Sequence, residues 1–315
     1  MSLQYDVEFA KEAAPVLQHL AQTPKPALHD VATRRLMLGA MTNEQFSLPN
    51  DVEHVVHSVA ALDGHTVPVY HFRKKLPPRE GGEPAIVHIH GGGYIALSAA
   101  GCATPHGESV SQTGVQIFSI DYRLAPENSY PVPLDDCWAV LQWIHSKVKQ
   151  FSINPARIAV MGESAGGGLA AALTLLARDR VLSPPLAKQI LVYPMLDDRT
   201  NSNHAGALAF WDENDNITGW TAYLGPKAGS DAIVPYAAPA RVDKVEGLPP
   251  LYLDCPQLDI FVHEGMKYAC RFVAANIPTE CHIYPGLPHG FEALASDIDV
   301  TKRVIENRYK AMSSF

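Results

Sequence analysis

The chain has little charge and few cysteines. Charged residues make up 18% of the 315 residues, below the ~25% that is usual for soluble domains, which indicates that much of the chain lies in a shared interior. None of the cysteines forms a C-x-x-C pair; the five are Cys102, Cys137, Cys255, Cys270 and Cys281. An odd number without that spacing predicts neither a disulfide framework nor a thiolate zinc site. We therefore expect reduced thiols and a cytoplasmic protein.

A surplus of positive charge is also absent. The sequence has 25 Lys and Arg against 33 Asp and Glu, a formal net charge of −8, which argues against binding to nucleic acid or to anionic lipid. The first residues, MSLQYDVEF, lack the basic and apolar regions of a secretory signal. The longest uncharged stretch, residues 84–107, is rich in Gly, Pro and His, so it does not read as a membrane-spanning helix.

Strand and helix patterns alternate along most of the chain. After a polar segment with helical patterning to about residue 39, two strands over residues 55–60 and 66–72 flank Asp63-Gly64, a strong hairpin signal. Short apolar runs follow at residues 85–89, 115–120, 157–161, 190–193, 251–253 and 281–284. Runs of this kind fit strands buried on both faces of a mainly parallel sheet. We predict a doubly wound α/β domain, which binds ligands beyond the carboxyl ends of its strands.

The alternation lapses between about residues 194 and 228. This segment holds a cluster of aromatic residues, namely Phe210, Trp211, Trp220 and Tyr223. We interpret it as a helical insertion over the strand ends, with aromatic rings lining a pocket. The alternative, that the rings only hold the insertion to the body, is equally consistent with the pattern.

The sharpest motif is G-E-S-A-G at residues 162–166, a G-x-S-x-G pattern. It follows the predicted strand at 157–161 and opens a predicted helix, which is the setting of a nucleophilic serine on a strained turn. The flanking glycines let neighbouring backbone pass without a Cβ. We therefore predict Ser164 as a nucleophile, with the N–H of Ala165 as a donor to a developing oxyanion.

A glycine run, H-G-G-G-Y at residues 90–94, follows the strand predicted at 85–89. Glycines leave backbone N–H groups uncovered, and each such donor aimed at an oxyanion contributes about 2.7–4 kcal/mol to a transition state. The run is not a phosphate loop, because no Gly-Lys-Ser/Thr follows it. His90 is expected to orient the run through a hydrogen bond.

A serine nucleophile needs a base and a carboxylate that orients the base. His289 follows the last predicted strand in a turn rich in Gly and Pro, as suits a base on a loop. For the acid, Asp259 lies between a strand and the helix that begins near Val262, whereas Asp254 lies at the strand terminus itself. Position alone leaves both open, and both give the chain order Ser, Asp, His.

With these motifs in place, the sequence resembles the hormone-sensitive-lipase-type carboxylesterases of the α/β-hydrolase fold. The resemblance runs from about residue 55 to 291 and rests on five segments in order: HGGG at 90–93, YRLAPE at 122–127, GESAG at 162–166, YPMLDD at 193–198 and HGF at 289–291. One departure is Glu163, where the family more often has Asp. Ile260-Phe261 also stands where Pro-Leu or Pro-Phe is frequent.

The resemblance implies roles for particular residues. It favours Asp259 as the acid, 30 residues before His289, and it adds Gly92 and Gly93 to Ala165 in the oxyanion hole. It also implies an α/β-hydrolase domain over residues 49–315, with a cap made of residues 1–48 and an insertion at about 198–228. Residues proposed for the substrate pocket are Tyr94, Phe210, Trp211 and Trp220. The family often forms homodimers through its last strand and helix, so a homodimer is the expected assembly.

The chain has 14 histidines, of which only His289 is assigned to chemistry. His88 and His90 would project from one face of a strand, but a metal site needs a third ligand and no further H-x-H or H-E-x-x-H motif stands in the sequence. We therefore expect no metal and no cofactor.

The expected activity is hydrolysis of short- to medium-chain carboxylic esters through an acyl-enzyme. Two alternatives remain from the sequence: a lactonase or amidase with the same triad, and a non-catalytic receptor for small ligands on a hydrolase scaffold.

Overall fold

One mainly parallel β-sheet forms the centre of the structure, a computed structural model that describes residues 2–40, 46–77, 79–201 and 204–315. Its strands are β1 (Val52–Ala60), β2 (Thr66–Lys74), β3 (Glu83–Ile89), β4 (Gln116–Ile120), β5 (Ile153–Glu163), β6 (Lys188–Val192), β7 (Leu251–Pro256) and β8 (Thr279–Tyr284). They lie in the order β1-β2-β4-β3-β5-β6-β7-β8. The first two pairs, β1 with β2 and β2 with β4, are antiparallel and the remaining pairs are parallel. The predicted α/β class is confirmed.

The predicted hairpin is present between β1 and β2. Val59 pairs with Val67 and Ala60 with Thr66, and the turn contains Gly64 at a φ of +85°. This left-handed conformation is one that glycine adopts without a steric cost. The tight turn at Asp63-Gly64 therefore sets the register of the first two strands.

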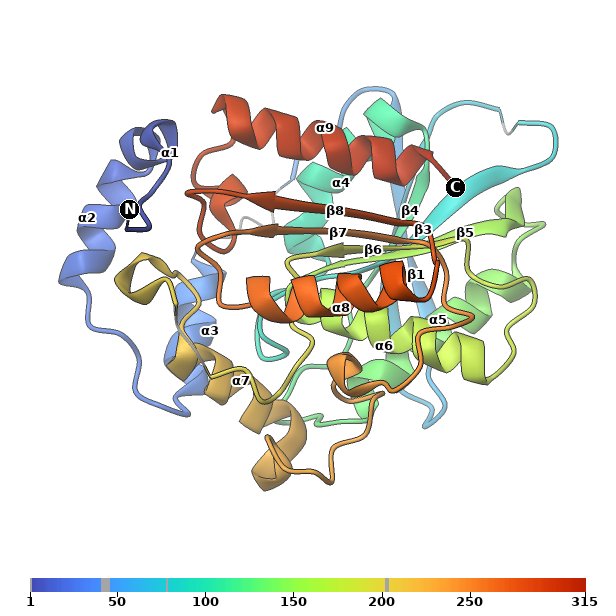
Figure 1. Cartoon of the computed structure of the whole chain (residues 1–315). Coiled ribbons are helices and arrows are strands. Elements are labelled where there is room, and N and C mark those ends of the chain that lie inside the picture. Colours follow the sequence, from blue (N-terminus) through green and yellow to red (C-terminus); the bar gives the residue numbers. More distant parts are fainter. Residues whose placement is uncertain (1, 41–45, 78, 202–203) are drawn as a thin grey trace.

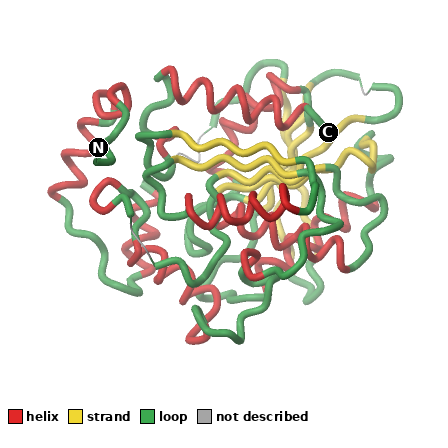
Figure 2. The backbone as a smooth tube through the Cα atoms, in the orientation of Figure 1, coloured by secondary structure: helices red, strands yellow, loops and turns green. Residues whose placement is uncertain are grey.

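Helices cover both faces of the sheet. They are α4 (Ala103–Thr113), α5 (Val132–Ser146), α6 (Ala165–Asp179), α8 (Val262–Ala274) and α9 (Asp299–Ser313). Figure 1 shows α4 and α9 over one face and α5, α6 and α8 over the other, and Figure 2 shows the strands as a single layer between them. Strands β3 and β4 are buried along almost their whole length, as expected for strands covered on both sides.

Strand β8 departs from the prediction. It was expected to be buried on both faces, but Glu280 and Cys281 are exposed. The reason is its position at the edge of the sheet, where it pairs with β7 alone. A short apolar run cannot by itself distinguish a central strand from an edge strand.

Four further helices lie beyond the strand ends: α1 (Val7–Glu12), α2 (Ala14–Gln22), α3 (Val31–Gly39) and α7 (Glu213–Leu224). Figure 1 shows them together on the side toward which β7 and β8 point. Nε of Arg34 on α3 lies 2.9 Å from Oδ1 of Asp215 on α7, and the Arg34 side chain is buried. The N-terminal helices and the insertion are thus joined directly. Among the described residues, no helix has the length and apolar character needed to cross a bilayer.

Candidate active site

Ser164 occupies the sharp turn between β5 and α6. Its φ of +54° and ψ of −119° are strained for a residue with a side chain. A Cβ on Gly162 would lie 2.2 Å from the carbonyl oxygen of Gly166, and one on Gly166 would lie 2.0 Å from that of Ile89. Only glycine fits at these two positions, so the G-x-S-x-G spacing follows from the close approach of β5, α6 and β3.

Backbone hydrogen bonds hold this turn in place. The N–H of Ser164 donates to the carbonyl of Val192 at 2.9 Å, and the carbonyl of Ser164 accepts from Met195 at 2.9 Å and from Gly168 at 3.0 Å. The turn is therefore fixed to the loop that follows β6. The strain at Ser164 persists because the surrounding backbone determines it.

His289 and Asp259 form a close pair. Nδ1 of His289 lies 2.5 Å from Oδ2 of Asp259, and the carboxylate is fully buried while the imidazole is 14% exposed. The other carboxylate oxygen, Oδ1, accepts from the N–H of Phe261 at 2.9 Å. Since a carboxylate only accepts, Nδ1 carries the proton and Nε2 keeps its lone pair. Both residues follow the carboxyl ends of neighbouring strands, β8 and β7.

Asp254 has different partners. It lies inside β7 rather than at its terminus, and its two oxygens accept from Nε and Nη2 of Arg308 at 2.8 and 2.9 Å. The Tyr252 hydroxyl also donates to it at 3.0 Å. Asp254 is thus committed to a buried ion pair with α9, and the structure brings Asp259 to His289 instead.

The glycine run lies against the serine turn. A Cβ on Gly91 would lie 3.4 Å from Cβ of Ser164. Gly92 and Gly93 have φ values of +109° and +61°, and the carbonyl of Gly92 accepts from Ile95 and Ala96 at 3.0 Å each. These positive φ values turn the backbone sharply in the segment that follows Gly91.

His90 contacts this glycine run through its side chain. Its Nδ1 lies 2.8 Å from the carbonyl oxygen of Gly91, which confirms the predicted hydrogen bond. The ring stacks on Tyr122, whose hydroxyl donates to the carbonyl of His90 at 2.9 Å. Burial lowers the pKa of His90 to about 4, so its ring is neutral at physiological pH. A neutral ring there places no positive charge under the loop.

Trp211 lies between the glycine run and the histidine. A Cβ on Gly93 would come within 2.3 Å of the Trp211 ring, and that ring lies 6.5 Å from the ring of His289. Tyr193 follows Val192, whose carbonyl accepts from the N–H of Ser164. The centroid of the Tyr193 ring lies 4.6 Å from that of the His289 ring. His289 therefore lies near the rings of Tyr193 and Trp211, and Gly93 lies against the Trp211 ring.

The other three residues proposed for the pocket have different ring contacts. The Tyr94 ring stacks on Tyr223 at 4.2 Å and packs against Trp220 at 5.2 Å, and both Tyr94 and Trp220 are buried. Phe210 contacts Phe9 of α1 at 6.1 Å and Tyr5 at 6.3 Å, so it joins the insertion to the N-terminal helices.

Sequence reasoning missed two aromatic neighbours of the histidine, Tyr193 and Phe261. The Phe261 ring lies 5.5 Å from that of His289, edge to face. The Tyr193 hydroxyl donates to Oε1 of Glu292 at 2.7 Å, and the same oxygen accepts from Nη1 of Arg308. The sequence did carry a signal for both residues. Tyr193 begins one of the five segments that resemble the family, and Phe261 stands two residues after Asp259.

Comparisons with known proteins agree with this geometry. A sequence profile of the α/β-hydrolase fold matches residues 86–293. Carboxylesterase NlhH of Mycobacterium tuberculosis is 35% identical over 215 residues, which cover 66% of this chain and 66% of the relative. Ethyl acetate hydrolase of Pseudomonas putida is 28% identical, covering 77% of this chain and 76% of its own.

A solved structure of a bacterial heroin esterase superposes with a TM-score of 0.89 at 32% identity, covering 98% of this chain and 97% of that one. The chain therefore belongs to the hormone-sensitive-lipase-type carboxylesterases, the carboxylic ester hydrolases of the α/β-hydrolase fold.

Proposed function

We propose that the chain hydrolyses short- to medium-chain carboxylic esters by a serine mechanism, with Ser164 as nucleophile, His289 as base and Asp259 as the carboxylate that orients it. The observation that carries the proposal is the His289–Asp259 pair at 2.5 Å, and the strained turn at Ser164 supports it. A pair of this kind is the arrangement that activates a serine hydroxyl.

The reaction follows in two halves. Nε2 of His289 takes the proton of the Ser164 hydroxyl as Oγ attacks the ester carbonyl, and the resulting imidazolium is stabilised by the buried carboxylate of Asp259. The imidazolium then gives the proton to the leaving alcohol, which leaves an acyl-serine. Water attacks this acyl group, again losing its proton to His289, and the acid departs with Ser164 restored. The mechanism uses only groups of this chain and requires no cofactor.

The oxyanion of each tetrahedral intermediate would be held by backbone N–H groups. We assign these donors to Gly92, Gly93 and Ala165. Two observations support the assignment: Gly91 lies against Ser164, and Ala165 begins α6 directly after the serine. The N-terminus of a helix also carries partial positive charge, which favours a developing oxyanion there.

The name of one relative supports a preference for small esters. The relative from Pseudomonas putida is named for ethyl acetate, an ester with a two-carbon acyl group. We expect acetate and butyrate esters to be preferred over long-chain ones.

Residues 1–48 and the insertion at 198–228 would form the cap over this site. The ion pair between Arg34 and Asp215 supports a joint cap. We further propose a homodimer through β8 and α9, supported by the exposed edge position of β8, and a cytoplasmic location, supported by five free cysteines. Sedimentation analysis tests the dimer.

A panel of substrates tests the proposed activity. Wild-type protein and the variant Ser164→Ala would be assayed on p-nitrophenyl esters of increasing acyl length, on one lactone and on one anilide. We expect wild-type turnover to be highest on short esters and to vanish in the variant. Greater turnover of the lactone or the anilide would replace esterase by the corresponding alternative, and no turnover of any substrate would favour a receptor.

A further inference from the structure

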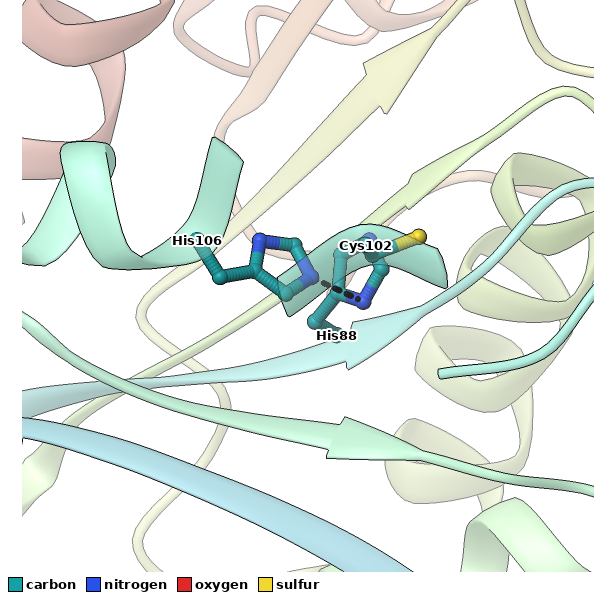
Figure 3. Close-up of side chains that lie close together, drawn as sticks. All are labelled: His88, Cys102 and His106. Carbon is teal, nitrogen blue, oxygen red and sulfur yellow. Dashed lines mark hydrogen bonds between the residues drawn. The ribbon is translucent and has the colours of Figure 1, made fainter. Parts of the chain in front are cut away.

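Three potential metal ligands meet behind the serine turn, outside the proposed active site. His88 lies on β3, Cys102 ends the short 3₁₀ helix Ala100–Cys102, and His106 lies in the first turn of α4. One ligand atom from each lies within 4.8 Å of the others. Figure 3 shows the His106 ring pointing at the His88 ring, with the Cys102 side chain beside them. Both histidines are buried.

Local structure brings the three residues together. Cys102 is the N-cap of α4, and His106 follows it by four residues, or about one helical turn, so the two side chains lie on one face of the helix. That helix packs over β2 and β4, and β4 pairs directly with β3. The spacing Cys-x-x-x-His was the sequence signal for this pair. His90, which the sequence analysis considered together with His88, bonds to the carbonyl of Gly91 instead.

A carboxylate orients His88 for this role. Nε2 of His88 lies 2.7 Å from Oε2 of Glu163, and since the carboxylate accepts, Nε2 carries the proton. Nδ1 therefore presents its lone pair, and it faces Nε2 of His106 at 2.9 Å and the Ser119 hydroxyl at 2.8 Å. Histidine ligands of metals characteristically donate their other N–H to a carboxylate in this way.

We propose that His88 Nδ1, His106 Nε2 and Cys102 Sγ bind one zinc-class transition-metal ion. Two imidazoles and a thiolate suit Zn²⁺ or Co²⁺ rather than Ca²⁺ or Mg²⁺, which take oxygen ligands. Binding releases the thiol proton of Cys102 to solvent and moves the His106 proton from Nε2 to Nδ1. Water fills the fourth position of the tetrahedron.

The two nitrogen ligands require only a small adjustment. Nitrogen ligands at about 2.0–2.1 Å from a tetrahedral zinc ion lie roughly 3.3 Å from each other. The two imidazole nitrogens are 2.9 Å apart, so they must separate by a few tenths of an ångström to admit the ion. The Ser119 hydroxyl then loses its acceptor at Nδ1 and is placed to bond the metal-bound water.

The ion would lie next to the reaction centre without taking part in hydrolysis. Glu163, which orients His88, directly precedes Ser164 in the chain. No step of ester hydrolysis uses the three ligands, so metal binding is independent of the proposed function and is tested by its own signals.

Cobalt spectroscopy provides the test. Reduced, metal-free protein carrying Cys270→Ser and Cys281→Ser, which remove the two exposed thiols, would be titrated with Co²⁺. We expect one equivalent to give a near-ultraviolet sulfur-to-cobalt charge-transfer band and the intense visible bands of tetrahedral cobalt. Excess Zn²⁺ should abolish both and raise Tm by about 4 °C at 100 times its Kd. Absence of the charge-transfer band would overturn the proposal.

Variants locate the ion. Cys102→Ser should remove the charge-transfer band, and His106→Gln, which keeps a donor toward His88, should weaken binding at least tenfold. Two controls should keep the charge-transfer band. They are His282→Gln, next to position 281, and His289→Gln, at the proposed catalytic base. Retention of the band in Cys102→Ser, or its loss in His289→Gln, would contradict the assignment.

A measurement without ligand variants covers the case in which these variants fail to fold. Wild-type protein would be alkylated with and without Zn²⁺, and the modified cysteines identified by peptide mapping. We expect Zn²⁺ to slow alkylation of Cys102 at least tenfold while leaving Cys270 unchanged. Equal rates at Cys102 with and without Zn²⁺ would overturn the proposal.

Discussion

Nδ1 of His289 lies 2.5 Å from Oδ2 of Asp259, whereas Asp254, five residues earlier, is bonded through both oxygens to Arg308. The two carboxylates are both buried and both belong to the β7 region, yet one orients an imidazole and the other forms a structural ion pair. This division of roles distinguishes two carboxylates that position in the sequence alone left open.

Replacing Asp259 should damage catalysis and replacing Asp254 should damage stability. Asp259→Asn removes the carboxylate that holds the proton on Nδ1, so kcat should fall by about 10⁴-fold with little change in unfolding. Asp254→Asn removes the carboxylate that accepts from two nitrogens of the buried Arg308 and leaves that guanidinium paired with Glu292. It should lower the free energy of unfolding by about 3 kcal/mol, with kcat of the folded fraction kept within tenfold. Ester kinetics and urea unfolding of both variants measure this, and the reverse pattern would reassign the acid.

A methyl group at Gly93 should impair the oxyanion hole. It would lie 2.3 Å from the Trp211 ring, so Gly93→Ala must displace the loop, and we expect kcat to fall by about 10²–10³-fold. The double variant Gly93→Ala, Trp211→Ala removes the clash and should recover at least tenfold of that loss. Steady-state kinetics on a short ester provide the readout.

Gly64→Ala is the matched control for this substitution. Gly64 has a positive φ of +85° and nothing within 4 Å of the added Cβ, so the variant carries the backbone strain without the clash. We expect its kcat to equal that of the wild type. A Gly93→Ala variant as active as Gly64→Ala would remove Gly93 from the proposed oxyanion hole.

Glu264 on α8 should make stability depend on pH. Burial raises its pKa from the ordinary value of 4.5 to about 8. Between pH 4.5 and pH 8 the folded protein therefore keeps a proton that the unfolded chain releases. The stabilising contribution is fully present below about pH 4.5 and is lost as the pH rises through about 8. The free energy of unfolding, measured in urea, should therefore fall over this range relative to that of Glu264→Gln.

The glutamine variant preserves the contacts of this side chain. Its carbonyl oxygen can accept from the N–H of Leu196, as Oε1 of Glu264 does at 2.6 Å, and its amide can donate to the Thr200 hydroxyl, which donates to Oε2 in the wild type. Glu246→Gln, at an exposed site, is the control and should reproduce the wild-type pH dependence. If Glu264→Gln also reproduces the wild-type pH dependence, the carboxyl group of Glu264 ionises in the folded protein with its ordinary pKa, and the prediction is wrong.

The sequence predicted those parts of the molecule that depend on local backbone constraints. The glycines at 162 and 166 are required by approaches of 2.2 and 2.0 Å, and the hairpin requires a glycine at 64 with positive φ. Steric requirements of this kind leave a trace in neighbouring residues, so motif and turn signals locate them. The strand segments were also predicted, because each forms a contiguous apolar run in the sequence.

Long-range partners could not be predicted. Spacing left Asp254 and Asp259 as alternatives because Arg308, which occupies Asp254, lies 54 residues away on α9. The edge position of β8 depends on the order of strands in space, and an apolar run carries no information about that order. His88, Cys102 and His106 meet only because α4 packs over the sheet, so a search for ligands close in sequence paired His88 with His90 instead.

The central claim is that Ser164 is the nucleophile, and steady-state hydrolysis of p-nitrophenyl acetate by Ser164→Ala tests it most directly. The matched control is Ser109→Ala, at a half-buried serine on α4 whose hydroxyl donates to the carbonyl of Pro105. We predict that Ser164→Ala lowers kcat by at least about 10⁴-fold while remaining folded, and that Ser109→Ala is fully active. A Ser164→Ala variant within tenfold of the wild-type kcat would contradict the account.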